Sequence, residues 1–382
     1  MENLIDTIPE TDRIGNAEIS SKNDNVIPEP SFDDSIFTPD SVLGHIEELE
    51  EKAAEDEARQ GLFLVKPASN WIDAAKQRPI PMKLFGDLWY EGELCILYAD
   101  TNLGKSILAV QIGNAISRGE SISGFPNESS LQKILYFDFE LSEKQFEARY
   151  SENYENHYPW DSNFLRAVIN PDDPIVTSHQ SFEEYLYASI EQSISTMNAR
   201  VLIIDNITYL KNETEKAKDA LPLMKKLKEI GRKHSLSILA LAHTPKRDLS
   251  KPITRNDLQG SKMLINFCDS AFAIGESYQD GSIRYLKQIK ARNTEIIYDI
   301  ENVCICQIVK SINFLQFEFV SYGKEYEHLR QLSKTDKEKR IAEVLVLKEE
   351  GKSNAEIARL YGVTEGSIRK WLKKVNEHGQ EK

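Results

Sequence analysis

A Gly-Lys-Ser triplet at positions 104–106 has the residue types that could bind phosphate groups. It ends the segment A-D-T-N-L-G-K-S. The apolar run 94–98 before it predicts a buried strand, and residues 105–118 after it predict a helix. The apolar stripe expected on this helix consists of Ile107, Leu108, Gln111, Ile112 and Ala115. A loop between a strand and a helix N-terminus aims unpaired backbone N–H groups and the positive end of the helix dipole at one point, which suits a triphosphate.

Three residues of this loop have predicted roles. Gly104 lets the backbone approach phosphates, the Lys105 ammonium would reach the β and γ oxygens, and the Ser106 hydroxyl would hold a magnesium ion. ATP and Mg²⁺ are therefore the expected cofactors. The complete predicted binding set is Ala99, Asp100, Thr101, Asn102, Leu103, Gly104, Lys105, Ser106 and Ile107. Ala99 replaces the first glycine of the motif, which requires a negative φ there. The alternative is an ordinary strand-to-helix turn.

Two acidic residues end apolar runs further along the chain. Glu140 closes K-I-L-Y-F-D-F-E, and Asp205 closes V-L-I-I-D, 100 residues after Lys105. The carboxyl ends of parallel strands face the ligand crevice of an open α/β sheet. We predict that Glu140 orients the attacking water and that Asp205 holds magnesium with Ser106. For Glu140 the alternative is a surface charge at the start of the helix that Ser142 would cap.

A histidine and two cations complete the predicted catalytic set. His243 ends the run S-I-L-A-L-A-H, where it could sense the γ-phosphate or link hydrolysis to a DNA-contacting loop; the alternative is a structural histidine. Lys290 and Arg292 lie two apart in a predicted strand, 283–292, so they share one face. Such cations suit a γ-phosphate contact in a neighbouring subunit. An exposed basic strand edge is the alternative.

The sequence of residues 333–382 predicts a small helical domain. Helices are predicted at 340–350, 354–360 and 365–375, and the pattern N-A-E-I-A-R-L-Y-G-V-T-E-G-S-I-R-K-W matches the small, turn and apolar positions of a helix-turn-helix. The predicted base contacts are Thr364 and Ser367, and the predicted phosphate contacts are Arg369, Lys370 and Lys373. The alternative is a small bundle that binds protein.

Charge and composition divide the chain into three parts. The formal net charge is −14, but residues 1–60 hold 17 Asp/Glu against 4 Lys/Arg. This segment predicts a disordered acidic arm, either docking or solubilising. An ATPase domain is expected at 61–325 and the helix-turn-helix at 333–382. The four cysteines are expected to be core thiols in a reducing compartment. No apolar run approaches the roughly 18 residues of a membrane span, so we expect a cytoplasmic protein without membrane contact.

Five motifs in order resemble the RecA-like ATPases of the plasmid replicative helicase RepA and the DnaB/KaiC group, within the AAA-type ATPases. They are A-D-T-N-L-G-K-S, Y-F-D-F-E, L-I-I-D-N, A-H-T-P-K and K-A-R-N, and the resemblance covers residues 71–322. It implies a RecA-like P-loop α/β core with a mostly parallel twisted sheet. It also implies that Glu140 is the catalytic glutamate, that Asp205 and His243 match the family's strand-end acid and histidine, and that Lys290 and Arg292 act in trans.

The resemblance further implies a homo-oligomeric ring, usually of six subunits, with ATP sites at subunit boundaries. The expected function is Mg-dependent ATP hydrolysis coupled to work on DNA, as in a replicative helicase of a plasmid or mobile element. Single-stranded DNA would pass through the ring, and duplex DNA would bind the C-terminal module. The alternatives are an ATP-switched DNA-binding regulator and a partner-loading ATPase without helicase activity.

Overall fold

The computed structural model describes residues 63–173, 182–210, 217–245, 247–258, 261–331, 334–361 and 363–378. The acidic arm expected at 1–60 lies outside these residues. The chain divides into two compact units at Pro79 and Ile80. Helix α2 (Ala68–Lys76) belongs to the first unit and buries none of its residues. Among the described residues, no helix is both long and apolar enough to cross a bilayer.

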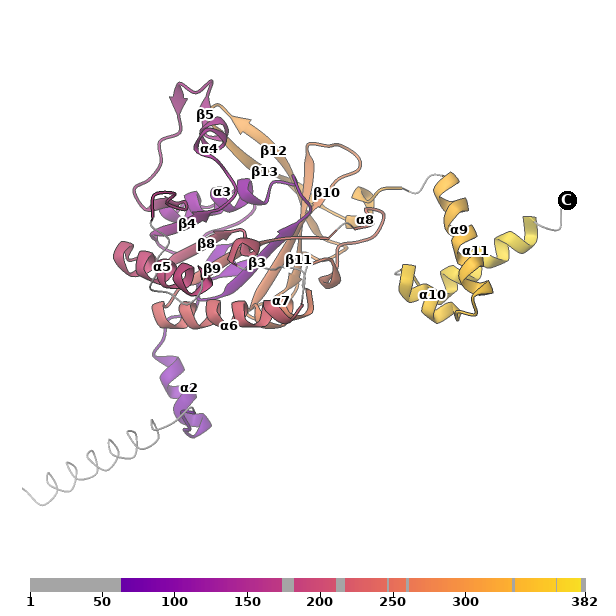
Figure 1. The fold of residues 1–382 in the computed structure, drawn as a ribbon, viewed down its shortest axis with the longest axis horizontal. Helices are drawn as coiled ribbons and strands as arrows, with labels where there is room; N and C mark the ends of the chain where they lie inside the picture. The colour runs from indigo at the N-terminus through magenta and orange to yellow at the C-terminus, as the bar shows by residue number, and fades with distance from the viewer. Residues whose placement is uncertain are drawn as a thin grey trace, which may run out of the picture. The chain divides into compact units, whose positions relative to one another are not determined.

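A nine-stranded sheet forms the centre of the second unit, with the strand order β13-β12-β11-β10-β3-β9-β8-β4-β7 (Figure 1). Six neighbouring strands are parallel: β3 (Leu94–Ala99), β4 (Ile134–Asp138), β7 (Phe164–Ala167), β8 (Val201–Asp205), β9 (Ser237–His243) and β10 (Ser270–Glu276). Three antiparallel strands extend it: β11 (Ile283–Lys290), β12 (Val303–Ser311) and β13 (Phe314–Gly323). The expected mostly parallel α/β sheet is confirmed.

Helices cover both faces of this sheet. Helix α3 (Lys105–Arg118) lies on one face, while α5 (Phe182–Met197), α6 (Ala217–His234) and α7 (Ser261–Phe267) lie on the other (Figure 1). Strand β3 alternates between the two cores, with Ile96 and Tyr98 packing on one side and Cys95 and Leu97 on the other. Because both faces are covered, the central strands read as continuous apolar runs.

Shorter elements connect the larger ones. They are the hairpins β1 (Lys83–Phe85) with β2 (Trp89–Tyr90) and β5 (Ser151–Glu152) with β6 (Asn156–His157), helices α4 (Glu143–Arg149) and α8 (Glu325–His328), and the 3₁₀ turns at Ile207–Leu210 and Arg255–Asp257. Helix α4 begins at the predicted cap, because Ser142 accepts a hydrogen bond from the Gln145 N–H in a full capping box. All four cysteines are free and buried, as expected.

The single apolar stripe predicted for α3 is wrong in extent. Twelve of its fourteen residues are buried. Strand β13, at the edge of the same sheet, also packs against the helix, and Gln111 exchanges two 2.8 Å hydrogen bonds with the backbone of Phe317. A glutamine that pairs with a backbone N–H and C=O can be buried without leaving its polar groups unsatisfied. The helix is therefore buried over most of its surface, and only Ser106 and Arg118 remain partly exposed.

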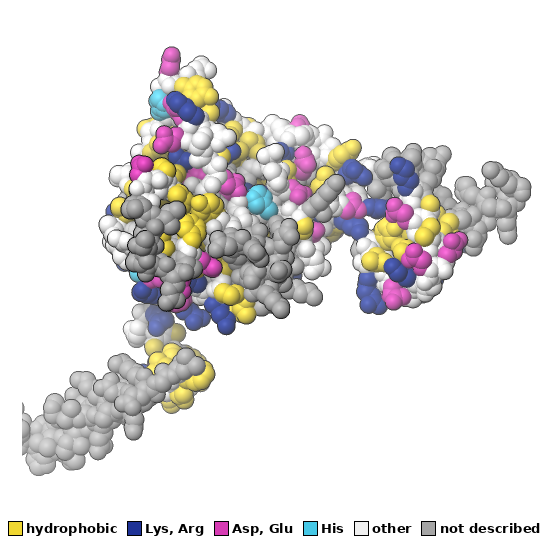
Figure 2. Space-filling view, viewed as in Figure 1, with side chains coloured by type: hydrophobic (Ala, Val, Ile, Leu, Met, Phe, Trp, Pro, Cys, Tyr) yellow, Lys and Arg dark blue, Asp and Glu magenta, His cyan; other side chains and the backbone are white. Residues whose placement is uncertain are grey.

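The C-terminal helices form a small core of their own. Helices α9 (Lys334–Glu349), α10 (Asn354–Tyr361) and α11 (Glu365–His378) pack around Val344, Ile357, Ala358 and Ile368. Trp371 and Val363 pack against this core, as the helix-turn-helix pattern predicted, whereas Gly362 lies outside the described residues. Figure 2 shows cationic and anionic side chains intermixed on the surface of these helices.

Candidate functional site at the carboxyl ends of the parallel strands

The loop between β3 and α3 has the backbone that the motif requires. Gly104 precedes α3 with φ 95°, and a Cβ at this position would lie 2.9 Å from the Phe317 ring, so only glycine fits. Ala99 ends β3 with a negative φ, which meets the condition for alanine at the first motif position. Leu103 and Ile107 are buried in the core, so only their backbone N–H groups could contact a phosphate, while Thr101 and Asn102 are exposed.

Lys105 is buried and points back across its own loop. Its Nζ lies 3.2 Å from each of three acceptors: the Ala99 carbonyl, the Asp100 carbonyl and His243 Nδ1. Burial lowers the pKa of Lys105, and the nearby carboxylates of Asp205 and Glu140 oppose that shift. All three ammonium donors are engaged within the protein, so phosphate oxygens would have to replace these acceptors.

Asp205 ends β8 and is fully buried beside the loop. Its Oδ2 accepts a 2.8 Å hydrogen bond from Tyr136, whereas its Oδ1 has no partner of good geometry among the described residues. Burial raises the pKa of Asp205 to about 6, against the opposing effect of hydrogen bonding from Ser106. A buried carboxylate oxygen without a partner next to a serine hydroxyl is a donor set that suits Mg²⁺. The residues therefore fit the predicted metal.

Glu140 and His243 meet above Asp205. His243 Nε2 lies 3.3 Å from Glu140 Oε1, and Asn206 donates to the same carboxylate oxygen. The hydrogen bond with His243 is the main cause that lowers the pKa of Glu140, so the carboxylate is ionised at neutral pH. Four side chains are therefore neighbours at this edge of the sheet. They come from the loop and from the ends of three strands, β4, β8 and β9, and they are Lys105, Glu140, Asp205 and His243.

Two residues of this edge escaped the sequence analysis. Asn206 contacts both Glu140 and His243, and its Oδ1 accepts a 2.8 Å hydrogen bond from the Thr208 N–H. It is the last residue of the motif L-I-I-D-N, but the sequence indicated no role for it. Arg247 is almost fully buried, with its Nε 3.7 Å from Asp100 Oδ2, in a segment that the sequence marks only as polar and rich in turns. Both contacts join segments that are distant in the chain, which periodicity cannot reveal.

Lys290 and Arg292 do not join this cluster within one chain. Strand β11 ends at Lys290, so the prediction that Arg292 lies in the same strand is wrong. Lys290 pairs with Ala271, which lies near the start of β10 at the opposite edge of the sheet. Lys290 Nζ donates to the carbonyls of Ile265, in the last turn of α7, and Cys268, directly after that helix. Arg292, about half exposed, bonds Asp269 at 2.8 Å.

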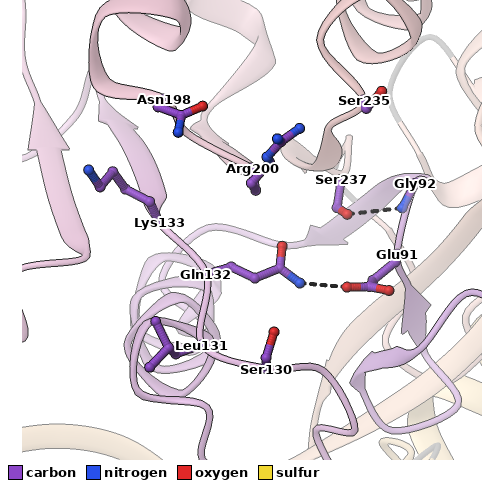
Figure 3. A pocket seen from close by; sticks show the side chains of 10 residues that line it. All are labelled: Glu91, Gly92, Ser130, Leu131, Gln132, Lys133, Asn198, Arg200, Ser235 and Ser237. Atoms are coloured by element: carbon purple, nitrogen blue, oxygen red, sulfur yellow. Dashed lines mark hydrogen bonds between the residues drawn. The ribbon is translucent and has the colours of Figure 1, made fainter.

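A pocket of about 530 Å³ also lies at that opposite edge, where β3, β4, β8 and β9 begin (Figure 3). Its lining is polar, with Lys133 and Arg200 as the cations and Glu91 as the acid. Glu91 accepts a 2.6 Å hydrogen bond from Gln132, and Ser237 accepts one of 2.9 Å from the Gly92 N–H (Figure 3). This pocket is separate from the loop at Gly104 and is not the predicted nucleotide site.

The predicted DNA contacts lie at the start and on the outer side of α11. Thr364 caps the helix, since its Oγ1 accepts a 3.2 Å hydrogen bond from the Ser367 N–H. Arg369 and Lys370 are exposed, and Arg369 bonds Glu365 at 3.0 Å on the same helix. Lys373 is also exposed. Three predicted phosphate contacts therefore reach solvent.

Two family models match the chain. Residues 64–248 match an AAA domain, and residues 335–382 match a homeodomain-like domain. None of the curated proteins matches this sequence. Among solved structures, a KaiC-like protein from the hyperthermophilic archaeon Pyrococcus horikoshii matches with 14% identity and a TM-score of 0.39 over 60% of this chain and 90% of that one. Residues 64–248 are therefore similar to AAA domains, and the phosphate-loop backbone at Gly104 and the mostly parallel sheet agree with this match.

Proposed function

We propose that the chain hydrolyses ATP with magnesium and uses the energy for work on DNA, in the manner of a ring-forming replicative helicase of a plasmid or mobile element. The proposal rests chiefly on the convergence of Lys105, Asp205, Glu140 and His243 at one edge of a P-loop domain. The domains we propose are an ATPase at 61–325 and a helix-turn-helix at 333–382, in a protein that works in the cytoplasm.

The chain's own groups would divide the reaction among them. Lys105 and the backbone N–H groups of its loop bind the phosphates, and Ser106 and Asp205 hold the metal, which when bound neutralises charge on the phosphate oxygens. The ionised Glu140 accepts a hydrogen bond from the attacking water and aligns it with the γ-phosphorus. His243 bridges Glu140 and Lys105, so it can respond to whether a phosphate has displaced the ammonium.

A neighbouring subunit would complete the site. Lys290 and Arg292 lie at the sheet edge opposite the P-loop, and Arg292 is partly exposed. Head-to-tail contacts place the opposite edges of two copies against each other, and such contacts close into a ring when the rotation allows it. We propose that Lys290 and Arg292 contact the γ-phosphate held by the next subunit, in a ring of about six copies, the number that the resemblance implies.

DNA would be bound in two ways. Duplex DNA would bind α11, where Arg369, Lys370 and Lys373 contact phosphates and Thr364 and Ser367 contact base edges. Single-stranded DNA would pass through the ring. In the alternative function, the C-terminal module is the main DNA reader and ATP only controls oligomerisation and site occupancy. The separate core of the module favours this regulator, because a self-contained reader needs no ring.

One assay separates these functions. We expect the ATP turnover of the full chain to rise several-fold with single-stranded DNA and to disappear in Lys105→Ala, and we expect the chain to become larger by sizing when ATP is present. Lys133→Ala at the opposite edge is the matched control. Turnover that ignores DNA, together with duplex binding that is lost in Lys370→Ala, would support the regulator. Turnover without either DNA dependence would indicate a partner-loading ATPase.

A further inference from the structure

The turn that carries Glu140 is held by a buried carboxylate. Asp138, the last residue of β4, has a fully buried side chain. Its Oδ1 accepts hydrogen bonds from two backbone N–H groups of the turn, those of Glu140 at 3.1 Å and Leu141 at 2.9 Å. A carboxylate that accepts two successive N–H groups fixes the direction in which the chain leaves the strand. The backbone position of Glu140 thus depends directly on Asp138.

An arginine from the neighbouring strand binds both Asp138 and the same turn. Arg166 lies on β7, paired in register with Tyr136 of β4. Its Nε and Nη2 both lie 2.9 Å from Asp138 Oδ2, and Nη2 also donates to the Leu141 carbonyl at 2.7 Å. The guanidinium lies 4.5 Å from the centre of the Phe146 ring in α4. The planar fork of arginine can make these contacts at once, and a lysine ammonium cannot.

The backbone and the side chain of Glu140 are held by different residues. Asn206 and His243 hold its carboxylate, and Asp138 with Arg166 holds the turn from which that carboxylate extends. Arg166 is mostly buried but lies in the outermost strand of the sheet on that side, away from Lys105 and its loop.

We infer that Asp138 and Arg166 are positioning residues that hold the Glu140 turn in register with the γ-phosphate. This inference rests on the proposed ATP hydrolysis, since it assigns no ligand of its own. A displacement of about 1 Å in a catalytic group can cost about 100-fold in rate. Because neither residue contacts the P-loop, its loss should slow the chemical step and leave nucleotide binding intact.

The test measures steady-state ATP turnover of the full chain and its Arg166→Lys variant, with Arg118→Lys as the matched control. Arg118 also bonds a backbone carbonyl, that of Pro159, and lies 5.5 Å from the centre of the Tyr158 ring, but at the far end of α3. We expect Arg166→Lys to lower kcat about 10- to 100-fold with KM for ATP within about twofold. The acidic limb of its kcat–pH profile should move to higher pH. The variant turn would no longer hold Glu140 next to His243, and that contact lowers the pKa of Glu140. Arg118→Lys should change neither.

A double-mutant cycle decides whether the effect passes through Glu140. In the Glu140→Gln background, Arg166→Lys should have no further effect on the residual turnover. Additive losses in that background, or an unchanged kcat in Arg166→Lys, would overturn the inference. If Arg166→Lys does not fold, Asp138→Asn provides the same test, since it keeps the acceptor for the two N–H groups and loses the charge facing Arg166. If Glu140→Gln itself leaves turnover unchanged, the proposed function fails at its catalytic base, and the inference fails with it.

Discussion

The two edges of the central sheet use charged residues differently. At the carboxyl edge, Lys105, Asp205 and Glu140 meet in one cluster, where burial lowers the pKa of the lysine and raises that of the aspartate. At the amino edge, Asp269 alone forms ion pairs with two cations, Lys228 at 2.9 Å and Arg292 at 2.8 Å. Burying charged groups with perturbed pKa values costs free energy and is typical of a functional site, whereas partly exposed ion pairs such as those of Asp269 contribute little to stability.

The largest effect in one chain is expected at the carboxyl edge. Glu140→Gln replaces the anionic carboxylate that would polarise the attacking water with a neutral, non-basic amide, and it should lower kcat about 1,000-fold while ATP binding persists. Rapid-quench turnover and nucleotide titration measure the two quantities separately. A variant that keeps more than a tenth of wild-type turnover would place the base elsewhere.

Arg292→Ala tests whether the amino edge acts only between copies. Its exposed ion pair is worth less than about 1 kcal/mol, so the free energy of unfolding should hardly change. ATP turnover should nevertheless fall about 100-fold, because the neighbouring site loses a cation that stabilises charge on the γ-phosphate. Lys290 alone would supply only part of that stabilisation. Mixing Arg292→Ala with Lys105→Ala chains should restore turnover, since one copy supplies the loop and the other the arginine. If the mixture shows no gain, the residue does not act in trans.

Asp205 links the site to stability. Its raised pKa, about 6, means that the folded state favours the protonated carboxyl, so this contribution is complete below about pH 4 and is lost as the pH rises through 6. The free energy of unfolding of Asp205→Asn should therefore be about 1–3 kcal/mol larger than that of the wild type at pH 7.5 without nucleotide. This stabilisation should be smaller at pH 5. Urea titrations at the two pH values measure it. An equal difference at both values would contradict the buried charge.

The smallest effect is expected for Lys133→Ala in the amino-edge pocket. Half-buried Lys133 lines that pocket away from the loop. Its removal should change the free energy of unfolding by less than about 0.5 kcal/mol and leave turnover unchanged. A loss of turnover as large as that of Arg292→Ala would make the whole amino edge, not one arginine, the surface that the next subunit needs.

The sequence predicted most elements because their signals are local. Helix α3 begins and ends at the expected residues, where Gly104 and Gly119 adopt left-handed conformations at its two ends. Strand-end positions also placed Asp205, Glu140 and His243 near one another, because parallel strands share an edge. The burial of nearly all of α3 was missed because part of it depends on contacts with β13, about 200 residues later in the chain.

The supporting residues could not be predicted for the same reason. Asn206, Arg247 and Arg166 become meaningful only when the register between strands is known, for example when Tyr136 is paired with Arg166. The end of β11 at Lys290 depends on where its pairing with β10 stops, which no periodicity in K-Q-I-K-A-R-N reveals. Roles in trans depend on a second copy and stay predictions.

The most direct test of the account is calorimetric titration of Mg-ATP into the full chain, Lys105→Ala and Lys133→Ala. The account predicts binding by the wild type and by Lys133→Ala with the same Kd, and a loss of at least about 100-fold in Lys105→Ala, whose unfolding midpoint confirms that it is folded. No binding by the wild type, or equal binding by Lys105→Ala, would contradict the claim that the carboxyl edge holds the nucleotide.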